Sequence, residues 1–72
     1  MLLSVNFVNK IKIARAKRQL TQKQLGKLVG VSDNQIHRWE NGNTKPNLKS
    51  LMRLSEVLEI DIEELLKAME EE

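Results

Sequence analysis

Apolar residues recur at steps of three and four along almost the whole of the 72-residue chain. This spacing places them on one face of an α-helix, and no segment shows the strict alternation of a half-buried β-strand. Five apolar stripes can be separated: Phe7, Val8, Ile11 and Ala14; Leu25, Leu28 and Val29; Ile36 and Trp39; Leu48, Leu51, Leu54, Val57 and Leu58; and Ile62, Leu65, Leu66 and Met69. The sequence therefore predicts an all-α fold of five short helices.

The small size of the chain limits what it can do. Residues 1–72 fit a single domain, and a domain of this size buries only about 60% of the surface of its unfolded chain. We therefore expect a binding surface rather than an enzyme with an enclosed cleft. The chain has no cysteine and one histidine, which excludes a disulfide framework and a zinc site built from these residues. We expect no catalytic residues, no metal, no cofactor and no small-molecule substrate.

Capping residues mark the ends of the predicted helices. Three pairs have the capping-box spacing, in which a side chain and a backbone group satisfy each other: Thr21 with Gln24, Ser32 with Gln35, and Asp61 with Glu64. Asn47, just after the single proline, is expected to cap the fourth helix. Gly30 and Gly42 stand where the second and third helices should end, since glycine adopts the left-handed conformation without a Cβ clash.

The connection between the second and third helices is very short. Only Gly30 and Val31 separate the second helix from the Ser32 cap of the third, so the two helices must cross closely at a steep angle. Gly26 stands inside the second helix, where glycine costs about 1 kcal/mol relative to alanine. Its presence is explained if the third helix approaches the second helix at this residue.

Charge is distributed unevenly along the chain. Residues 1–53 carry eleven lysines and arginines against two acids, whereas residues 54–72 carry one lysine against eight acids. Such polarity favours a polyanion at one end of the molecule and excludes it from the other, although segregated solvated helix faces would give the same pattern. With one Phe, one Trp and no Tyr, stacking platforms for single-stranded nucleic acid are scarce. Duplex DNA is therefore the expected polyanion.

The predicted third helix, about residues 33–41, has two different faces. At about 100° per residue, five polar side chains fall on one face, and they are Asp33, Asn34, His37, Arg38 and Asn41. Ile36 and Trp39 point the other way, toward the core. Asparagine, arginine and aspartate can each form directional hydrogen bonds with the base edges of the major groove. The polar face is therefore a candidate DNA-reading surface.

Residues 22–39, QKQLGKLVGVSDNQIHRW, resemble the helix-turn-helix of the phage repressor/Cro (XRE-like) regulators. The resemblance includes the small residue Gly26, the turn residue Gly30, and the apolar positions Leu25, Val29, Val31, Ile36 and Trp39. The segments ENGNTKP (40–46) and LEIDIEELL (58–66) are similar to later parts of the same domain. The resemblance implies a compact five-helix, lambda-repressor-like DNA-binding domain. Its helix-turn-helix core would span residues 22–41, and an acidic C-terminal helix would span about residues 61–70.

The resemblance also implies a role for each matching position, with the third helix in the major groove. Asp33, Asn34 and Arg38 match base-reading positions, and His37 lies beside them, where it could reach a base or a phosphate. Six further positions match contacts to the DNA phosphates: Thr21, Gln22, Asn41, Asn43, Thr44 and Lys45. Lys45 could instead serve solubility alone. Asp33 departs from the pattern because its carboxylate repels phosphates unless it meets a cytosine amino group or pairs with Arg38.

Glu40 is expected to have a structural role. On the same helical wheel it falls nearer the core than the polar face, and a buried carboxylate needs a partner. Arg15 occupies the position from which the resembled family supplies a salt bridge between the first and third helices. We therefore predict an Arg15–Glu40 pair as a structural brace, and the alternative is an exposed Glu40.

The function expected from these features is that of a cytoplasmic, sequence-specific, double-stranded DNA-binding transcriptional regulator, acting as a repressor. One short helix reads few base pairs, so we expect a homodimer, at least on DNA, and a palindromic operator. The apolar side chains of the acidic helix could form the dimer surface or simply close the core. The alternative is an antitoxin or protein-interaction adaptor whose main partner is another protein. No export signal or membrane segment is expected.

Overall fold

The computed structural model describes residues 5–70, and residues 1–4 and 71–72 of the predicted domain lie outside this range. It contains the five predicted helices: α1 (Val5–Lys17), α2 (Gln22–Val29), α3 (Asp33–Glu40), α4 (Leu48–Leu58) and α5 (Ile62–Glu70). Within residues 5–70 there is no strand, and none of the helices has the length and apolar character needed to cross a membrane. The prediction of an all-α, five-helix fold is confirmed.

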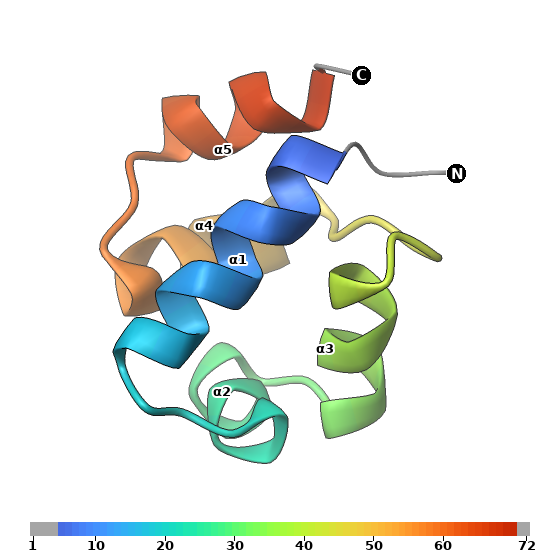
Figure 1. The fold of residues 1–72 in the computed structure, drawn as a ribbon, viewed down its shortest axis with the longest axis vertical. Coiled ribbons are helices and arrows are strands. Elements are labelled where there is room, and N and C mark those ends of the chain that lie inside the picture. Colours follow the sequence, from blue (N-terminus) through green and yellow to red (C-terminus); the bar gives the residue numbers. More distant parts are fainter. Residues whose placement is uncertain (1–4, 71–72) are drawn as a thin grey trace.

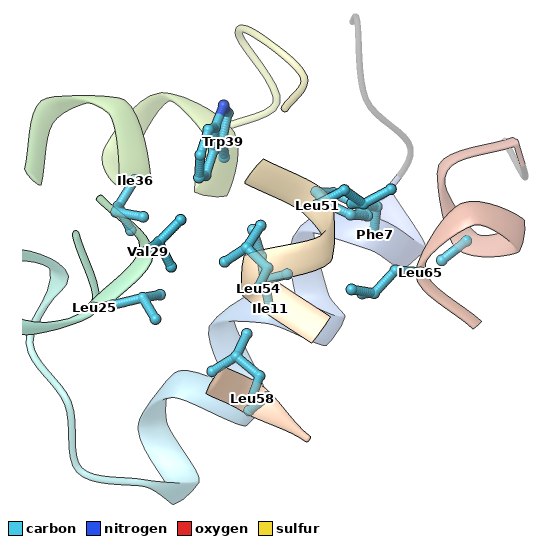
Figure 2. Packing of buried hydrophobic residues seen from close by; sticks show 12 residues of the cluster. Phe7, Ile11, Leu25, Val29, Ile36, Trp39, Leu51, Leu54, Leu58 and Leu65 are labelled. Atoms are coloured by element: carbon cyan, nitrogen blue, oxygen red, sulfur yellow. The ribbon is translucent and has the colours of Figure 1, made fainter. Parts of the chain in front are cut away.

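All five helices contribute to one core. The buried apolar side chains are Phe7, Ile11, Ala14, Leu25, Val29, Ile36, Trp39, Leu51, Leu54, Leu58, Leu65 and Ala68. Figure 2 shows the labelled members of this cluster converging from the surrounding helices on α4. α5 packs on α1 and α4, whereas α2 packs on α3 and α4. α3 therefore lies away from α5, at the other end of the molecule (Figure 1).

Three leucines assigned to apolar stripes, Leu28, Leu48 and Leu66, are exposed, so these stripes are only partly buried. Leu28 is 47% exposed and Leu48 is 62% exposed. The buried face of α2 is centred on Leu25, Gly26 and Val29, which turns Leu28 outward. Leu48 is the first residue of α4 and precedes the part of the helix that enters the core.

The side chains considered for a dimer surface divide between the core and the exterior. Leu65 of α5 is fully buried, together with Ala68. Leu66 is exposed, and Ile62 and Met69 are partly buried against the core. α5 therefore closes the monomer with one face and leaves Leu66 on the outside.

The predicted caps are present to different degrees. Thr21 and Gln24 form a complete capping box, in which Thr21 Oγ1 accepts from the Gln24 backbone N–H at 3.0 Å and Gln24 Oε1 accepts from the Thr21 N–H at 2.8 Å. Asn47 caps α4 by accepting from the Ser50 N–H at 2.9 Å. The side chain of Ser32 accepts the Gln35 N–H at 3.2 Å and so caps α3.

The predicted Asp61–Glu64 capping box is not formed within residues 5–70, and Glu64 makes a different contact. The carboxylate of Glu64 accepts a hydrogen bond from Lys10 Nζ of α1 at 3.0 Å. A lysine brought close by the packing of α1 on α5 therefore competes with the backbone for this carboxylate.

The tight turn between α2 and α3 requires its glycines. Gly30 lies in this turn and has φ of +91°. Gly42 lies in the next connection, just after α3, and has φ of +76°. A Cβ atom on Gly26 would lie 2.7 Å from the carbonyl oxygen of Val31 and 3.2 Å from backbone atoms of Ser32. The turn therefore passes directly over Gly26, which fixes the crossing of the two helices.

Gly26→Ala is expected to lower the free energy of unfolding by about 1–3 kcal/mol, since the atoms that a Cβ would meet are backbone and cannot rotate away. Helix propensity alone predicts the opposite sign, a gain of about 1 kcal/mol. Urea unfolding followed by circular dichroism measures the change. A more stable variant would show that the turn does not press on Gly26.

Candidate nucleic-acid interface

α3 presents the predicted polar face to the exterior. The side chains of Asp33, Asn34, His37, Arg38 and Asn41 are all exposed. On the opposite side of the helix Ile36 and Trp39 are fully buried, and Figure 2 shows both side chains projecting from α3 into the core. The structure thus brings the predicted base-reading residues together on one rigidly anchored helix.

Hydrogen bonds organise this face. His37 Nε2 and Asn41 Nδ2 lie 2.9 Å apart, one helical turn from each other. Asp33 Oδ1 accepts the backbone N–H of Asn34 at 3.0 Å, within the first turn of the helix. Asn41 is also the C-cap of α3. His37 and Asn41 therefore act as a pair at the C-terminal end of the face, and Asp33 lies at its N-terminal end.

The loop that follows α3 carries three of the other predicted phosphate contacts. Asn43 and Lys45 are exposed, whereas Thr44 is half-buried. The Thr44 hydroxyl oxygen is buried without a hydrogen-bond partner, so the predicted phosphate contact of Thr44 requires a change of side-chain rotamer. Asn43 donates its backbone N–H to Arg38 O at 3.0 Å, which holds the start of the loop against α3.

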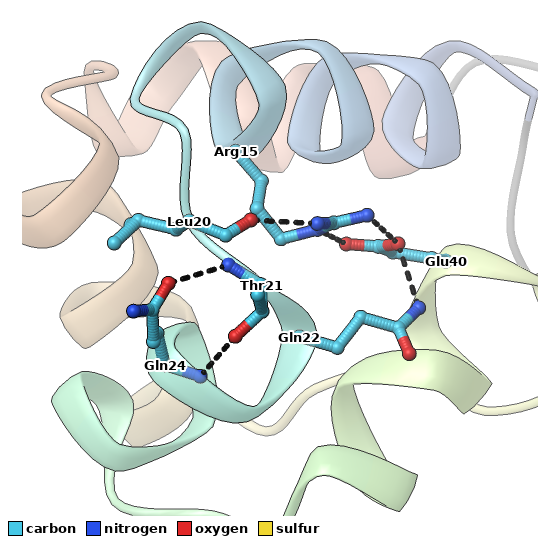
Figure 3. Close-up of polar contacts among 6 residues, drawn as sticks. All are labelled: Arg15, Leu20, Thr21, Gln22, Gln24 and Glu40. Atoms are coloured by element: carbon cyan, nitrogen blue, oxygen red, sulfur yellow. Dashed lines mark hydrogen bonds and ion pairs between the residues drawn. The ribbon is translucent and has the colours of Figure 1, made fainter.

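The start of α2 contributes the last two predicted phosphate contacts. The hydroxyl of Thr21 is already used in capping, although the residue is exposed. Gln22 is the first residue of α2 and is half-buried. Its side-chain amide donates to Glu40 Oε1 at 3.0 Å (Figure 3). A helix N-terminus favours an anion, because its first N–H groups lack partners within the helix.

The structure brings Arg15 and Glu40 together, as expected. Arg15 Nε donates to Glu40 Oε2 at 2.6 Å, and Arg15 Nη2 donates to Glu40 Oε1 at 3.0 Å (Figure 3). The side chain of Glu40 is only 2% exposed, and that of Arg15 is 21% exposed. This bidentate pair joins α1 to the last residue of α3, and so fixes the position of the polar face relative to the core.

Two parts of this network were not anticipated. Arg15 Nη1 donates to the backbone oxygen of Leu20 at 2.7 Å, which holds the α1–α2 connection. Gln22, assigned only to a phosphate contact, is the third donor to Glu40. Gln22 and Glu40 are eighteen residues apart, and no short-range spacing connects them.

The acidic part of the chain lies away from the polar face. Glu59, which follows α4, pairs with Arg18, and Glu64 of α5 pairs with Lys10 of α1, each at 3.0 Å. Figure 1 shows α5 at the opposite end of the molecule from α2 and α3. The acidic segment therefore neutralises part of α1 and leaves the face of α3 free of nearby acidic helices.

Comparison with known proteins identifies the domain type. A model of a family described as helix-turn-helix matches residues 11–65. Repressor protein C2 of Salmonella phage P22 is 41% identical over 58 residues, which are 81% of this chain and 27% of that protein. The crystal structure of the P22 c2 repressor in complex with a synthetic operator superposes with a TM-score of 0.82, at 39% identity, over 86% of this chain and 94% of the solved chain.

Two further relatives show the range of proteins that contain such a domain. The transcriptional activator BcrR of Enterococcus faecalis is 36% identical over 66 residues, which are 92% of this chain and 32% of BcrR. Hydroxypropylphosphonic acid epoxidase from S. wedmorenis is 28% identical, with a TM-score of 0.75, over 89% of this chain and 34% of the enzyme. The chain thus spans about a quarter to a third of the two curated relatives.

The family match covers more than half of the chain, and it includes the capped α2, the turn at Gly30 and the whole of α3. The chain therefore belongs to the helix-turn-helix family of the phage repressor/Cro (XRE-like) type.

Proposed function

We propose that this domain is a sequence-specific, double-stranded DNA-binding transcriptional regulator that acts as a repressor and inserts α3 into the major groove. The observation that carries the proposal is the division of α3 into a buried apolar side and an exposed side of five hydrogen-bonding residues. The similarity to a repressor solved in complex with an operator supports it.

The residues of the interface divide into two roles. Asp33, Asn34, His37 and Arg38 read base edges, since they lie on the exposed face of α3. The proposed phosphate contacts come from the start of α2, the C-cap of α3 and the loop that follows α3. The residues are Thr21, Gln22, Asn41, Asn43, Thr44 and Lys45. Phosphate contacts fix the register of the protein on the duplex, and base contacts supply the specificity.

Because α3 is short and reads few base pairs, we propose that the domain binds DNA as a dimer. α3 has eight residues and is therefore about 12 Å long. Two copies on half-sites one helical turn apart, about 34 Å, would double the sequence read and produce a palindromic operator. Leu66, exposed on α5, is the proposed centre of the contact between the two copies.

A protein-interaction adaptor is the second candidate, and one observation favours it. Leu48 and Met52 are exposed one helical turn apart on α4, and residues at this spacing share a helix face. Exposed neighbouring apolar side chains are typical of protein contact sites. An adaptor would bind its partner through this face and show no preference among DNA sequences.

Arg38→Ala and Lys45→Ala are expected to weaken DNA binding in different ways. Loss of Arg38 should cost about 1–3 kcal/mol on the operator and relax the preference at one base position, whereas loss of Lys45 should weaken all sequences alike. Loss of Lys45 should also reduce the dependence of log K on log salt concentration by about one. Fluorescence anisotropy with operator and scrambled duplexes at several salt concentrations measures both effects. If the two variants behave identically, the division between base-reading and phosphate-binding residues is wrong.

A further inference from the structure

The side-chain amide of Gln22 connects the start of α2, where a phosphate contact is proposed, with the Arg15–Glu40 pair. Gln22 lies at the start of α2, where a DNA phosphate is proposed to bind. Its Nε2 donates to Glu40 Oε1 at 3.0 Å, and the same oxygen accepts Arg15 Nη2 at 3.0 Å. A primary amide nitrogen carries two hydrogens, so the bond to Glu40 uses only one of them.

We propose that Glu40 is a positioning residue for DNA binding: its buried carboxylate holds the Gln22 amide in the orientation in which the second N–H meets a DNA phosphate. The proposal rests on the proposed function, since it concerns how the phosphate contact of Gln22 is made. It assigns the Arg15–Glu40 pair a role in affinity in addition to its role in stability.

The geometry supports positioning rather than direct contact by Glu40. Glu40 is almost fully buried, so its carboxylate does not reach DNA itself. Its charge would repel a phosphate, but the bidentate contact with Arg15 neutralises it locally. Gln22 is half-buried, which leaves part of its side chain accessible. The carboxylate therefore does not bind DNA itself, and its proposed effect on the phosphate contact comes from the orientation of Gln22.

The expected size of the effect follows from side-chain entropy. Fixing a side chain with several rotatable bonds costs about 0.5–1.5 kcal/mol, which corresponds to roughly a 2- to 12-fold change in affinity. If Glu40 already fixes the Gln22 side chain in the folded protein, this side-chain entropy is not lost again when DNA binds. Without Glu40, the phosphate contact of Gln22 should contribute little to the affinity for DNA.

A double-mutant cycle on DNA affinity tests the proposal. Gln22→Met removes both N–H donors and keeps the length of the side chain, and Glu40→Gln removes the charge and keeps the shape. In the wild-type background Gln22→Met should weaken operator binding about 10-fold, as expected for a hydrogen bond to a charged group. In the Glu40→Gln background the same change should weaken binding only about 3-fold or less, which is the expected coupling.

Lys45→Ala provides the matched control, since Lys45 is a proposed phosphate contact on the loop after α3. Its effect on affinity should be the same with and without Glu40→Gln. A merely structural role of Glu40 would reduce the effects of Gln22→Met and Lys45→Ala alike, or leave both unchanged, and either result would overturn the proposal.

A measurement on the wild-type chain covers the case in which Glu40→Gln does not fold. Nuclear magnetic resonance should detect the scalar coupling across the Gln22–Glu40 hydrogen bond in the free protein and again in the operator complex. Loss of this coupling on DNA binding would contradict the proposal, because Gln22 would then have left Glu40. A wild-type domain that shows no preference for any duplex would instead contradict the proposed function.

Discussion

Glu40→Ala is expected to lower the free energy of unfolding by about 3–5 kcal/mol, because it leaves the guanidinium of Arg15 without its carboxylate partner. The pair is bidentate, and the side chain of Glu40 is only 2% exposed. Small domains are stabilised by only about 5–15 kcal/mol in total. The substitution is therefore expected to remove a large part of the stability, and part of the protein should be unfolded at 37 °C.

Urea unfolding of a double-mutant cycle with Arg15→Ala measures the interaction itself. A coupling of less than about 1 kcal/mol would show that the pair contributes no more than a surface ion pair. Glu59→Ala is the matched control, since Glu59 also pairs with an arginine, Arg18, at 3.0 Å but is 78% exposed. Its loss should cost at most about 1 kcal/mol.

Trp39→Ala is expected to cost about 3–5 kcal/mol, because Trp39 is the largest fully buried side chain of the core and its loss leaves a cavity. Trp39 anchors α3 from the side opposite the polar face, and it belongs to the buried cluster drawn in Figure 2. DNA binding should be weakened in parallel, because α3 would lose the packing that fixes its orientation.

Trp39→Phe separates packing from the polar group of the indole. The indole Nε1 is buried without a hydrogen-bond partner, and an unsatisfied buried donor costs about 1–3 kcal/mol. Phenylalanine removes this donor and keeps most of the apolar contact, so the loss should be below about 1.5 kcal/mol. A loss as large as that of Trp39→Ala would mean that the indole N–H makes an essential interaction. Circular dichroism follows unfolding in both variants.

Local signals in the sequence were sufficient for most of the fold. The caps at Thr21 and Asn47, and the glycines at positions 30 and 42, act over at most four residues, so their roles can be read from short segments. The two faces of α3 follow from helical periodicity alone. Gly26 was predicted to be a point of close approach because glycine is unfavourable inside a helix. The structure shows the turn at Val31 passing close to it.

The rest depends on the packing of distant segments. Leu28 and Leu48 have the same local spacing as buried leucines, and only the positions of the neighbouring helices leave them exposed. Glu59 ends α4 with φ of +55°, a conformation usually given to glycine, and its local sequence carries no signal for it. Long-range packing therefore sets which residues of each stripe enter the core.

In the candidate site, too, some features follow from local sequence and others depend on the packing of distant segments. The membership of the polar face was predictable, but the Gln22–Glu40 contact joins residues of different helices and needed the structure. The Arg15–Glu40 pair was expected because the wheel placed Glu40 near the core and the family resemblance supplied the partner. The burial of the Thr44 hydroxyl could not be predicted, since a loop side chain in a polar segment is ordinarily exposed.

Selection of binding sites from random duplex DNA determines whether α3 reads a DNA sequence. Repeated selection at moderate salt, followed by sequencing, should enrich a short palindromic motif whose half-sites are centred about one helical turn apart. Arg38→Ala should select a motif that is relaxed at one position in each half-site. Recovery of no enriched motif from a folded wild-type domain would contradict sequence-specific DNA binding by α3 and favour the protein-interaction adaptor.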